Sequence, residues 1–282
     1  MPRLASHAVQ GELKPLANVR NIIAVGSGKG GVGKSTTAVN LALALAAEEL
    51  AVGVLDADVY GPSVPMMLGM SGRPDSPDGK SITPMHAHGI EAMSIGLLVD
   101  QDTPMIWRGP MATSALTQLL TETRWGDLDV LVVDLPPGTG DIQLTMSQKI
   151  PVAGAVIVTT PQDMATLDAR KALKMFEKLD IAVLGLVENM AVHVCTNCGH
   201  AEHIFGEGGA ARMSAQYGVP VLGSLPLEVA IRVQGDAGAP IVAAQPDSAP
   251  ARAYRDVARA LLGQLEKRPK RRSGIMASLL GG

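Results

Sequence analysis

The fold of this chain is decided at Gly28-Lys29-Gly30-Gly31-Val32-Gly33-Lys34-Ser35. Two glycines bracket four residues ahead of a Lys-Ser pair, which is the spacing of a phosphate-binding P-loop. Residues 21–26 before it form an apolar run typical of a short buried strand, and residues 36–48 after it, rich in Ala and Leu, predict a helix. A strand, a glycine loop and a helix N-terminus in this order aim backbone N–H groups and a helix dipole at an anion.

The residue types in this loop suit a nucleotide. Glycine lets the backbone approach phosphate oxygens closely, Lys34 can reach the β- and γ-phosphates, and the Ser35 hydroxyl can ligate Mg²⁺. The alternative is a glycine-rich turn that binds nothing, which the agreement of pattern, strand and helix disfavours. We expect the loop and the start of the helix to bind ATP through Gly28, Lys29, Gly30, Gly31, Val32, Gly33, Lys34, Ser35 and Thr36.

Composition narrows the class of protein. The 282 residues are 46% apolar, enough for a sizeable core, but only 2% aromatic, which argues against nucleic-acid binding by base stacking. A net charge of −3 gives no basic field for DNA or an anionic membrane. Residues 1–14 lack the apolar core of a signal peptide, and no apolar run reaches the length of a membrane span. We therefore expect a cytoplasmic protein without a membrane or nucleic-acid partner.

Apolar runs alternate with helical patterns along the chain. This alternation implies right-handed crossovers and an α/β fold with a single doubly wound, mostly parallel sheet covered on both faces. We expect this domain at residues 20–265, after a flexible arm or short docking segment at 1–19 and before a basic tail at 266–282. Further strands are predicted at 51–56, 89–96, 129–134, 153–160, 181–187 and 219–226, and further helices at 111–122, 163–178 and 249–265.

One strand end carries two aspartates where open α/β sheets place their ligands. Asp56 and Asp58 flank Ala57, and two carboxylates at this point can support Mg²⁺ and orient an attacking water. We expect Asp58 to position the water and Asp56 to assist it in the cofactor site. The alternative is a pair of loop aspartates that cap the next segment, a common use of this residue.

A second acidic strand end is Asp134, which closes the apolar run at 129–134 as in a Walker B strand. We expect Asp134 to hold Mg²⁺, directly or through water, and the alternative is a simple helix cap. The following residues 135–141, Leu-Pro-Pro-Gly-Thr-Gly-Asp, form a stiff loop with two glycine joints. Its place in the chain is that of a γ-phosphate sensor, which orders when nucleotide binds.

The two cysteines form a Cys-x-x-Cys pair at Cys195 and Cys198, and the spacing allows three interpretations. A thioredoxin-like redox pair would sit at a helix start in a different βαβ unit. A mononuclear zinc site would need further ligands from His193, His200 or His203. A cluster held by four cysteines needs two more thiolates than one chain has, and a symmetric dimer supplies them because a residue near a two-fold axis faces its own copy.

The P-loop also resembles a particular variant. A second lysine, Lys29, directly follows the first glycine, as in the deviant Walker A motif of the SIMIBI-class NTPases. That group includes partition and division-site ATPases, the nitrogenase iron protein and the Mrp/ApbC iron–sulfur carriers. The resemblance implies that Lys29 reaches across an ATP-sandwich homodimer to the partner's nucleotide, as a catalytic residue beside Lys34 and Asp58. The alternative for Lys29 is a solvated surface charge.

A longer set of motifs resembles the Mrp/ApbC iron–sulfur cluster carriers over about residues 20–262. It combines the P-loop and switch loops with Glu188-Asn189-Met190, a cysteine-bearing insertion near 193–209, the segment 223–227 and the Trp-Arg-Gly-Pro run at 107–110. By this resemblance Cys195 and Cys198 hold a [4Fe–4S] cluster that bridges two subunits. It also implies that Asn189 hydrogen-bonds the adenine, where the alternative is an asparagine in a tight turn.

Together these observations predict a homodimeric ATPase that couples ATP hydrolysis to loading or transfer of an iron–sulfur cluster. Its expected partners are cluster scaffold proteins and apo iron–sulfur proteins. The alternative is a ParA/MinD-like positioning ATPase with a structural zinc at the cysteine pair. The scarcity of aromatic residues and the lack of a basic face or an amphipathic membrane helix count against that alternative.

Overall fold

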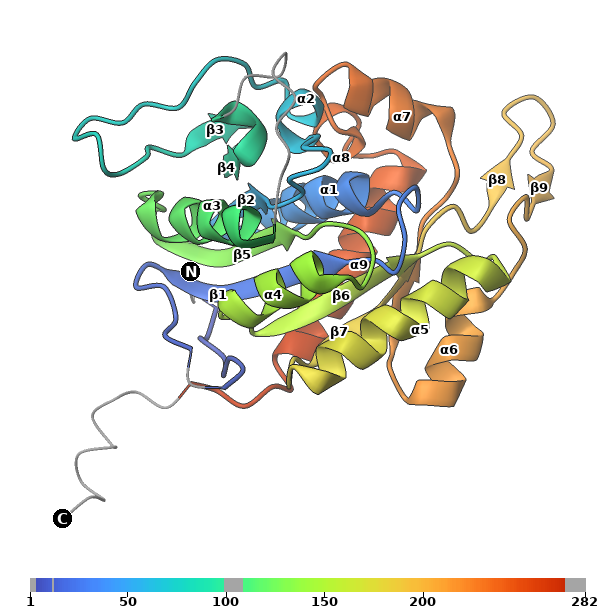
Figure 1. Cartoon of the computed structure of the whole chain (residues 1–282). Helices are drawn as coiled ribbons and strands as arrows, with labels where there is room; N and C mark the ends of the chain where they lie inside the picture. Colours follow the sequence, from blue (N-terminus) through green and yellow to red (C-terminus); the bar gives the residue numbers. More distant parts are fainter. Residues whose placement is uncertain (1–3, 12, 99–108, 272–282) are drawn as a thin grey trace.

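The computed structural model describes residues 4–11, 13–98 and 109–271. Within these residues one large sheet has the strand order β10-β7-β6-β1-β5-β2-β4-β3 (Figure 1). The described pairings in it are parallel except at the edge, where β3 runs antiparallel to β4. Its strands are β1 (Val19–Gly26), β2 (Val52–Asp56), β3 (Met85–Ala87), β4 (Ile90–Ser94), β5 (Leu128–Asp134), β6 (Gly154–Thr159), β7 (Val183–Glu188) and β10 (Val221–Ser224).

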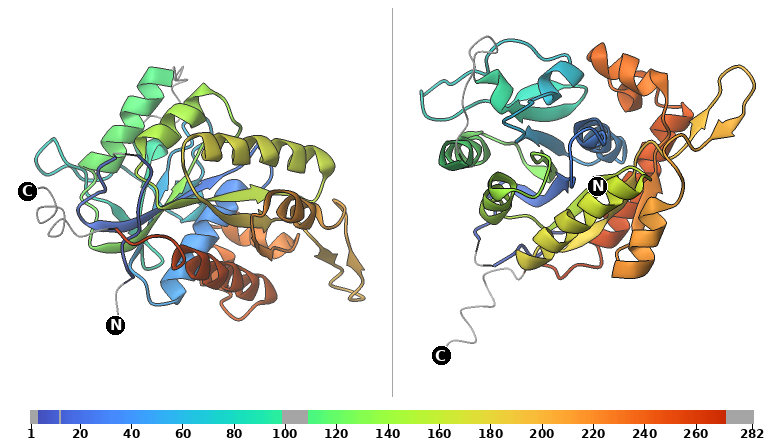
Figure 2. Two further views of the ribbon diagram at one scale, coloured as in Figure 1. Left: turned by 90° about the horizontal axis from the view of Figure 1, so that it is seen from below. Right: turned by 45° about the vertical axis from the view of Figure 1, so that its right-hand side comes forward.

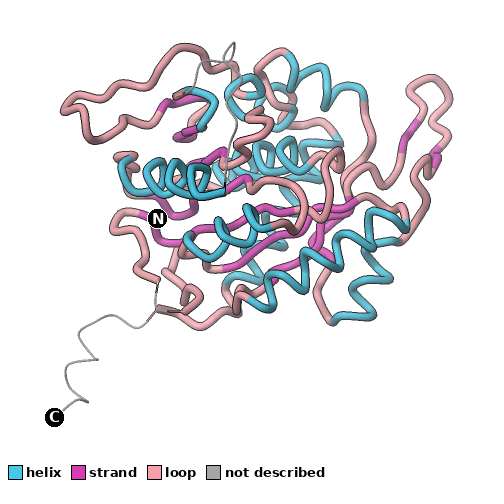
Figure 3. Tube along the Cα trace, in the orientation of Figure 1, coloured by secondary structure: helices cyan, strands magenta, loops and turns pink. Residues whose placement is uncertain are grey.

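Helices alternate with the strands along the chain and cover both faces of the sheet (Figures 2 and 3). On one face lie α1 (Lys34–Ala47) and α9 (Ala249–Leu265), and on the other lie α3 (Gly109–Glu122), α4 (Asp141–Lys149) and α5 (Asp163–Lys178). The shorter elements are α2 (Val64–Met67), η1 (Ile95–Leu97), α6 (Gly209–Tyr217), α7 (Val229–Asp236) and α8 (Ile241–Ala244).

The central strand β1 explains why the sequence showed continuous apolar runs. Ile23 and Val25 point into the core beneath α1 and α9, whereas Ile22 and Ala24 point into the core beneath α3 and α5. Because successive residues of a strand face opposite sides, a strand covered on both faces needs apolar residues throughout. The predicted doubly wound, mostly parallel sheet is confirmed.

The strand predicted at 89–96 is shorter in the structure, where β4 ends at Ser94. The Ser94 hydroxyl accepts a hydrogen bond from the Gly96 N–H at 3.0 Å, and the chain turns there into the 3₁₀ helix η1. A side-chain cap of this kind offers the backbone an alternative to continuing the strand. The predicted Trp-Arg pair at 107–108 lies outside the described residues.

The N-terminal segment, predicted as a flexible arm or a short docking segment, has extensive contacts in its described part. His7 and Gln10 are buried, and the Gln10 side chain hydrogen-bonds the Ile150 carbonyl and the Val152 N–H at the end of α4. His7 also forms a β-bridge with Lys270 near the other end of the chain. Residues 4–11 therefore dock on the domain. No helix within the described ranges has the length and apolarity needed to cross a bilayer.

Candidate functional site

The P-loop joins β1 to α1 at the carboxyl end of the parallel strands. Gly31 and Gly33 have φ angles of 79° and 78°, in the left-handed region that side chains disfavour. Gly28 instead lies against α5, because a Cβ there would come within 2.1 Å of the Asp168 carbonyl oxygen. Gly30 has open space around it. The backbone conformation therefore requires glycine at Gly31 and Gly33, and the close packing against α5 requires glycine at Gly28.

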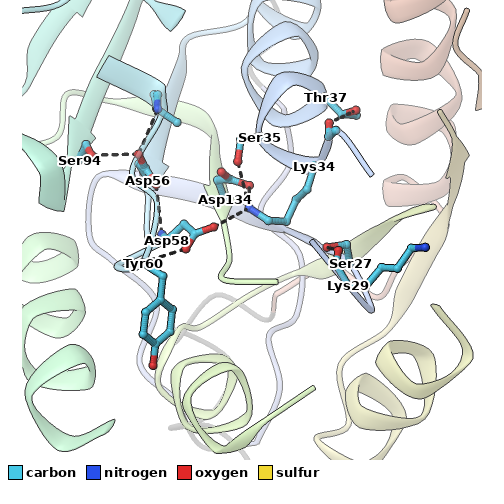
Figure 4. Close-up of polar contacts among 12 residues, drawn as sticks. Ser27, Lys29, Lys34, Ser35, Thr37, Asp56, Asp58, Tyr60, Ser94 and Asp134 are labelled. Atoms are coloured by element: carbon cyan, nitrogen blue, oxygen red, sulfur yellow. Dashed lines mark hydrogen bonds and ion pairs between the residues drawn. The ribbon is translucent and has the colours of Figure 1, made fainter. Parts of the chain in front are cut away.

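The Lys34 ammonium lies among three of the other residues predicted for the nucleotide and Mg²⁺ site (Figure 4). Its Nζ lies 2.6 Å from Asp134 Oδ1, 3.5 Å from Asp58 Oδ2 and 3.1 Å from Ser35 Oγ. These side chains come from α1, from the end of β5 and from the loop after β2, so three strand connections meet at one point. The structure brings together Lys34, Ser35, Asp58 and Asp134 as the sequence predicts.

Asp134 lies at the centre of this group, and its side chain is fully buried. Burial raises the pKa of its carboxyl, and the Lys34 ammonium opposes that shift. Its Oδ2 is buried without a hydrogen-bond partner among the described residues. An orphaned carboxylate oxygen beside the Ser35 hydroxyl is a hard oxygen donor set of the kind Mg²⁺ takes. The residues present therefore fit Mg²⁺.

The two aspartates at the end of β2, Asp56 in its last position and Asp58 two residues later, have different surroundings. Asp58 points at Lys34, whereas Asp56 accepts hydrogen bonds from the Asp58 N–H at 3.1 Å, the Val64 N–H at 3.1 Å and the Ser94 hydroxyl at 3.0 Å. Burial, followed by the charge of Asp134, raises the pKa of Asp56 to about 7. In the described part of the chain, Asp56 forms no hydrogen bond or ion pair with Lys34 or Ser35. Its contacts are those of a residue that holds the loop carrying Asp58, the use of aspartate given above as the alternative.

Lys29 is half-buried and points away from the Lys34 cluster (Figure 4). Its ammonium forms no ion pair with any residue in the described ranges, and its carbonyl accepts a hydrogen bond from the Ser27 hydroxyl at 2.9 Å. Within one chain Lys29 is thus not part of the group around Lys34.

A pocket of about 440 Å³ lies beside the N-terminus of α1. Asn189 lines it and also holds the P-loop, since its Nδ2 donates to the Val32 carbonyl at 2.8 Å. A Cβ on Gly33 would come within 2.2 Å of that nitrogen. The sequence did not single out most of the other lining residues, which belong to α2, α7, α9 and the segment before α7: Ser63, Met66, Met67, Pro226, Leu227, Glu228, Ile231, Arg232, Gly235, Asp236 and Tyr254.

The cysteine pair lies in a hairpin formed by β8 (His193–Val194) and β9 (Ala201–Glu202), which projects from the body of the domain (Figures 1 and 2). Cys195 is half-buried and Cys198 is exposed, and both are free thiols. Backbone N–H groups of Cys198 and Asn197 lower the pKa of Cys195. The tight turn between the strands therefore favours the thiolate, the form that binds metal.

The histidines near the hairpin do not complete a metal site within one chain. His193 Nδ1 lies 2.9 Å from the Leu227 carbonyl oxygen, and His203 Nδ1 lies 2.8 Å from the Ala191 carbonyl oxygen. Across the ranges that the structure covers, no three His, Cys, Asp or Glu side chains gather as a metal site. The mononuclear zinc site with His193, His200 or His203 is thus not assembled in these residues.

Fold and loop define the class of protein as a P-loop NTPase. Its sheet and helices superpose on the cell-division ATPase MinD from Pyrococcus furiosus with a TM-score of 0.64, over 86% of this chain and 98% of that one, at 23% identity. A nucleotide-binding protein from Archaeoglobus fulgidus, solved in complex with ADP, is 39% identical with a TM-score of 0.70, over 78% of this chain and 87% of that one.

Residues 18–262 match the model of the ParA family described as NUBPL iron-transfer P-loop NTPase, and the chain belongs to this family. It is 61% identical to an iron–sulfur cluster carrier protein of Pseudomonas fragi over 90% of each chain. It is 51% identical to the mouse iron–sulfur cluster transfer protein NUBPL, over 91% of this chain and 81% of that one. The resemblance drawn from the motifs is confirmed, and it favours the carrier over the positioning ATPase.

Proposed function

We propose that this chain is an iron–sulfur cluster carrier that binds and hydrolyses ATP and delivers a cluster to apoproteins. Apart from family membership, the proposal is supported by one contact between the P-loop and the segment that leads to the cysteine pair. Asn189 holds the P-loop through the Val32 carbonyl at 2.8 Å and stands only a few residues before the hairpin that bears Cys195 and Cys198. A change in the P-loop is therefore passed along a short stretch of chain to the cysteines that would hold the cargo.

At the nucleotide, each residue of the Lys34 cluster has a separate task. Lys34 turns from Asp134 to the β- and γ-phosphates when ATP binds, which frees the carboxylate of Asp134. Ser35 and Asp134 would hold Mg²⁺, which would neutralise negative charge at the phosphates. Asp58, which in the free chain lies 3.5 Å from Lys34 Nζ, orients the attacking water. Asn189 and the 440 Å³ pocket receive the base.

The cluster, as cargo, requires a homodimer because one chain supplies two thiolates of the four that a [4Fe–4S] cluster takes. Exposed apolar side chains support such a contact, since several follow the carboxyl ends of strands as the P-loop and the hairpin do. The most exposed are Val229 at 67%, Met164 at 66% and Tyr60 at 61%, with Val194 and Ile204 on or beside the hairpin. Exposed apolar side chains are the kind that an interface between subunits covers.

A transfer assay tests the coupling of ATP to delivery. Lys34→Ala protein, loaded with a cluster, is mixed with an apo-ferredoxin in the presence of ATP and Mg²⁺, and cluster arrival is followed by circular dichroism. We expect transfer at least about tenfold slower than for the wild type, because the phosphates lose their cation. The Cys195→Ser/Cys198→Ser variant is the control that carries no cargo. Equal transfer rates for Lys34→Ala and wild type would refute the coupling.

A further inference from the structure

A second cavity, of about 600 Å³, lies against α5 on the α4 and α6 side of the molecule. Thr139 of the loop at residues 135–141, Leu144 of α4 and Tyr217 of α6 contribute to its lining. The remaining lining residues come from α5 and include four side chains with a charge, all of them cations: Arg170, Lys171, Lys174 and Lys178. We call this cavity the α5 groove.

The charge of the α5 groove contrasts with the chain as a whole, which has a net charge of −3. Lys171 and Lys174 have exposed ion pairs within the helix, at 2.9 Å to Asp168 and 2.7 Å to Glu177, and such pairs are weak. Arg170 and Lys178 form no ion pair with residues in the described ranges, and the Nε of Arg170 is buried without an acceptor there. The groove therefore retains positive charge that the residues described by the structure do not neutralise.

The groove also has an apolar lining. Leu144, Leu167 and Met175 line it, and Leu167 is 43% exposed. Tyr217 adds an aromatic ring, over which the Lys174 ammonium lies at 5.3 Å from the centroid. Cations around an apolar lining suit a peptide with both acidic and apolar side chains. They suit the phosphate backbone of a nucleic acid less well, because that backbone gains little affinity from apolar contacts.

We propose that the α5 groove docks an acidic segment of a partner protein that carries apolar side chains. The geometry also connects this site to the nucleotide. The Asp168 carbonyl of α5 lies against Gly28 of the P-loop, and the Gly138 N–H, next to Thr139, donates to the Ser27 carbonyl at 3.0 Å. Both walls of the groove thus contact the P-loop or the residue directly before it, so docking and nucleotide binding influence each other. This inference does not depend on the cysteine pair.

The test uses a fluorescein-labelled helical peptide of glutamates with two leucines at positions i and i+4, followed by fluorescence anisotropy on the full chain. The groove variant is Arg170→Glu/Lys178→Glu. The matched control is Arg73→Glu/Lys80→Glu, which makes the same change of charge on exposed residues between α2 and β3. We expect the groove variant to raise the Kd at least about tenfold and the control less than about twofold. Equal thermal midpoints establish that both variants fold.

Three results would overturn the proposal: no peptide binding by the wild type, equal weakening in both variants, or a single-stranded oligonucleotide that binds the groove more tightly than the peptide. A peptide with lysine in place of glutamate should not bind. A non-hydrolysable ATP analogue should change the peptide Kd at least about threefold, in line with ordinary coupling energies. An unchanged Kd would contradict the connection to the P-loop while leaving docking itself intact.

Discussion

The ammonium of Lys34 contacts two buried carboxylates, with Nζ at 2.6 Å from Asp134 Oδ1 and 3.5 Å from Asp58 Oδ2. A cation in this position offsets part of the cost of placing negative charge in the interior. At the scale of single residues, the site in the free chain therefore consists of one buried cation shared by two carboxylates.

Removing that cation should destabilise the free protein in a pH-dependent way. In Lys34→Ala, Asp134 loses its partner, and we expect a loss of about 3 kcal/mol in the free energy of unfolding at pH 8. The loss should be smaller at pH 5, because the pKa of Asp134 is already raised by burial and rises further without Lys34, so the carboxyl takes up a proton. Urea denaturation of the variant and the wild type at both pH values measures the loss of stability. An equal loss at pH 5 and pH 8 would contradict the role given to Asp134.

Asp56 should also make the free energy of unfolding depend on pH, and its raised pKa gives the direction of the change. Its pKa is about 7 in the folded chain against an ordinary value of 3.8, so the folded state binds the proton more tightly than the unfolded state. The contribution of Asp56 to the free energy of unfolding is then greatest below pH 3.8 and falls as the pH rises towards 7, by up to about 1.4 kcal/mol per unit. Asp56→Asn should remove this slope in Mg²⁺-free buffer. Parallel stability curves for the variant and the wild type between pH 5 and 8 would show that Asp56 does not titrate there.

The contrast between Asp56 and Asp58 marks a limit of sequence reasoning at this scale. The sequence predicted both carboxylates at the end of one strand, with Lys34 of the P-loop close to them. What separates their roles is Ser94, which donates to Asp56 at 3.0 Å from a neighbouring strand 38 residues away in sequence. A contact that depends on strand order cannot be seen in a local pattern, whereas the strand, loop and helix of a P-loop form a local pattern, and the structure confirms these three elements.

At the scale of elements, α5 packs directly on the P-loop. Gly28→Ala would place its Cβ 2.1 Å from the Asp168 carbonyl oxygen, so α5 or the loop has to move. We expect a loss of about 1–3 kcal/mol in stability, as for other overpacked sites, together with weaker ATP binding. Gly30→Ala is the control, because no atom lies within 4 Å of its Cβ and stability should not change. Thermal unfolding and nucleotide titration check both, and similar losses in the two variants would contradict the packing argument.

Helices and strands were predicted correctly where the apolar pattern extends over many residues. The closing helix at 249–265 and the strands around β1 followed from apolar periodicity, since both faces of the sheet are covered. The missed elements are shorter: α4, α6 and α7 have eight or nine residues each, α2 spans Val64–Met67, and the β8–β9 hairpin has two residues in each strand. Such segments are held by tertiary contacts, for example the Asp56 carboxylate on the Val64 N–H, rather than by a repeat of their own.

At the scale of the whole molecule, Lys29 is the residue that most needs a second copy of the chain. It points away from Lys34 in its own subunit, as a residue acting on a partner's nucleotide would (Figure 4). We predict that Lys29→Ala and Asp58→Asn are each inactive in ATP hydrolysis but that their 1:1 mixture regains about a quarter of wild-type activity. Half of the dimers would be mixed, and each would contain one complete site. A mixture as inactive as its components would rule out action across the interface.

The central claim is that two chains hold one cluster between their hairpins, and anaerobic reconstitution with iron and sulfide tests it most directly. Visible absorption, molar mass in solution and iron, sulfide and zinc per chain are measured for the wild type and for Cys195→Ser/Cys198→Ser. We predict a brown dimer with four iron and four sulfide atoms per two chains, in line with a [4Fe–4S] cluster on four cysteines, and a colourless cysteine variant. A colourless wild-type monomer that retains one zinc per chain would contradict the account.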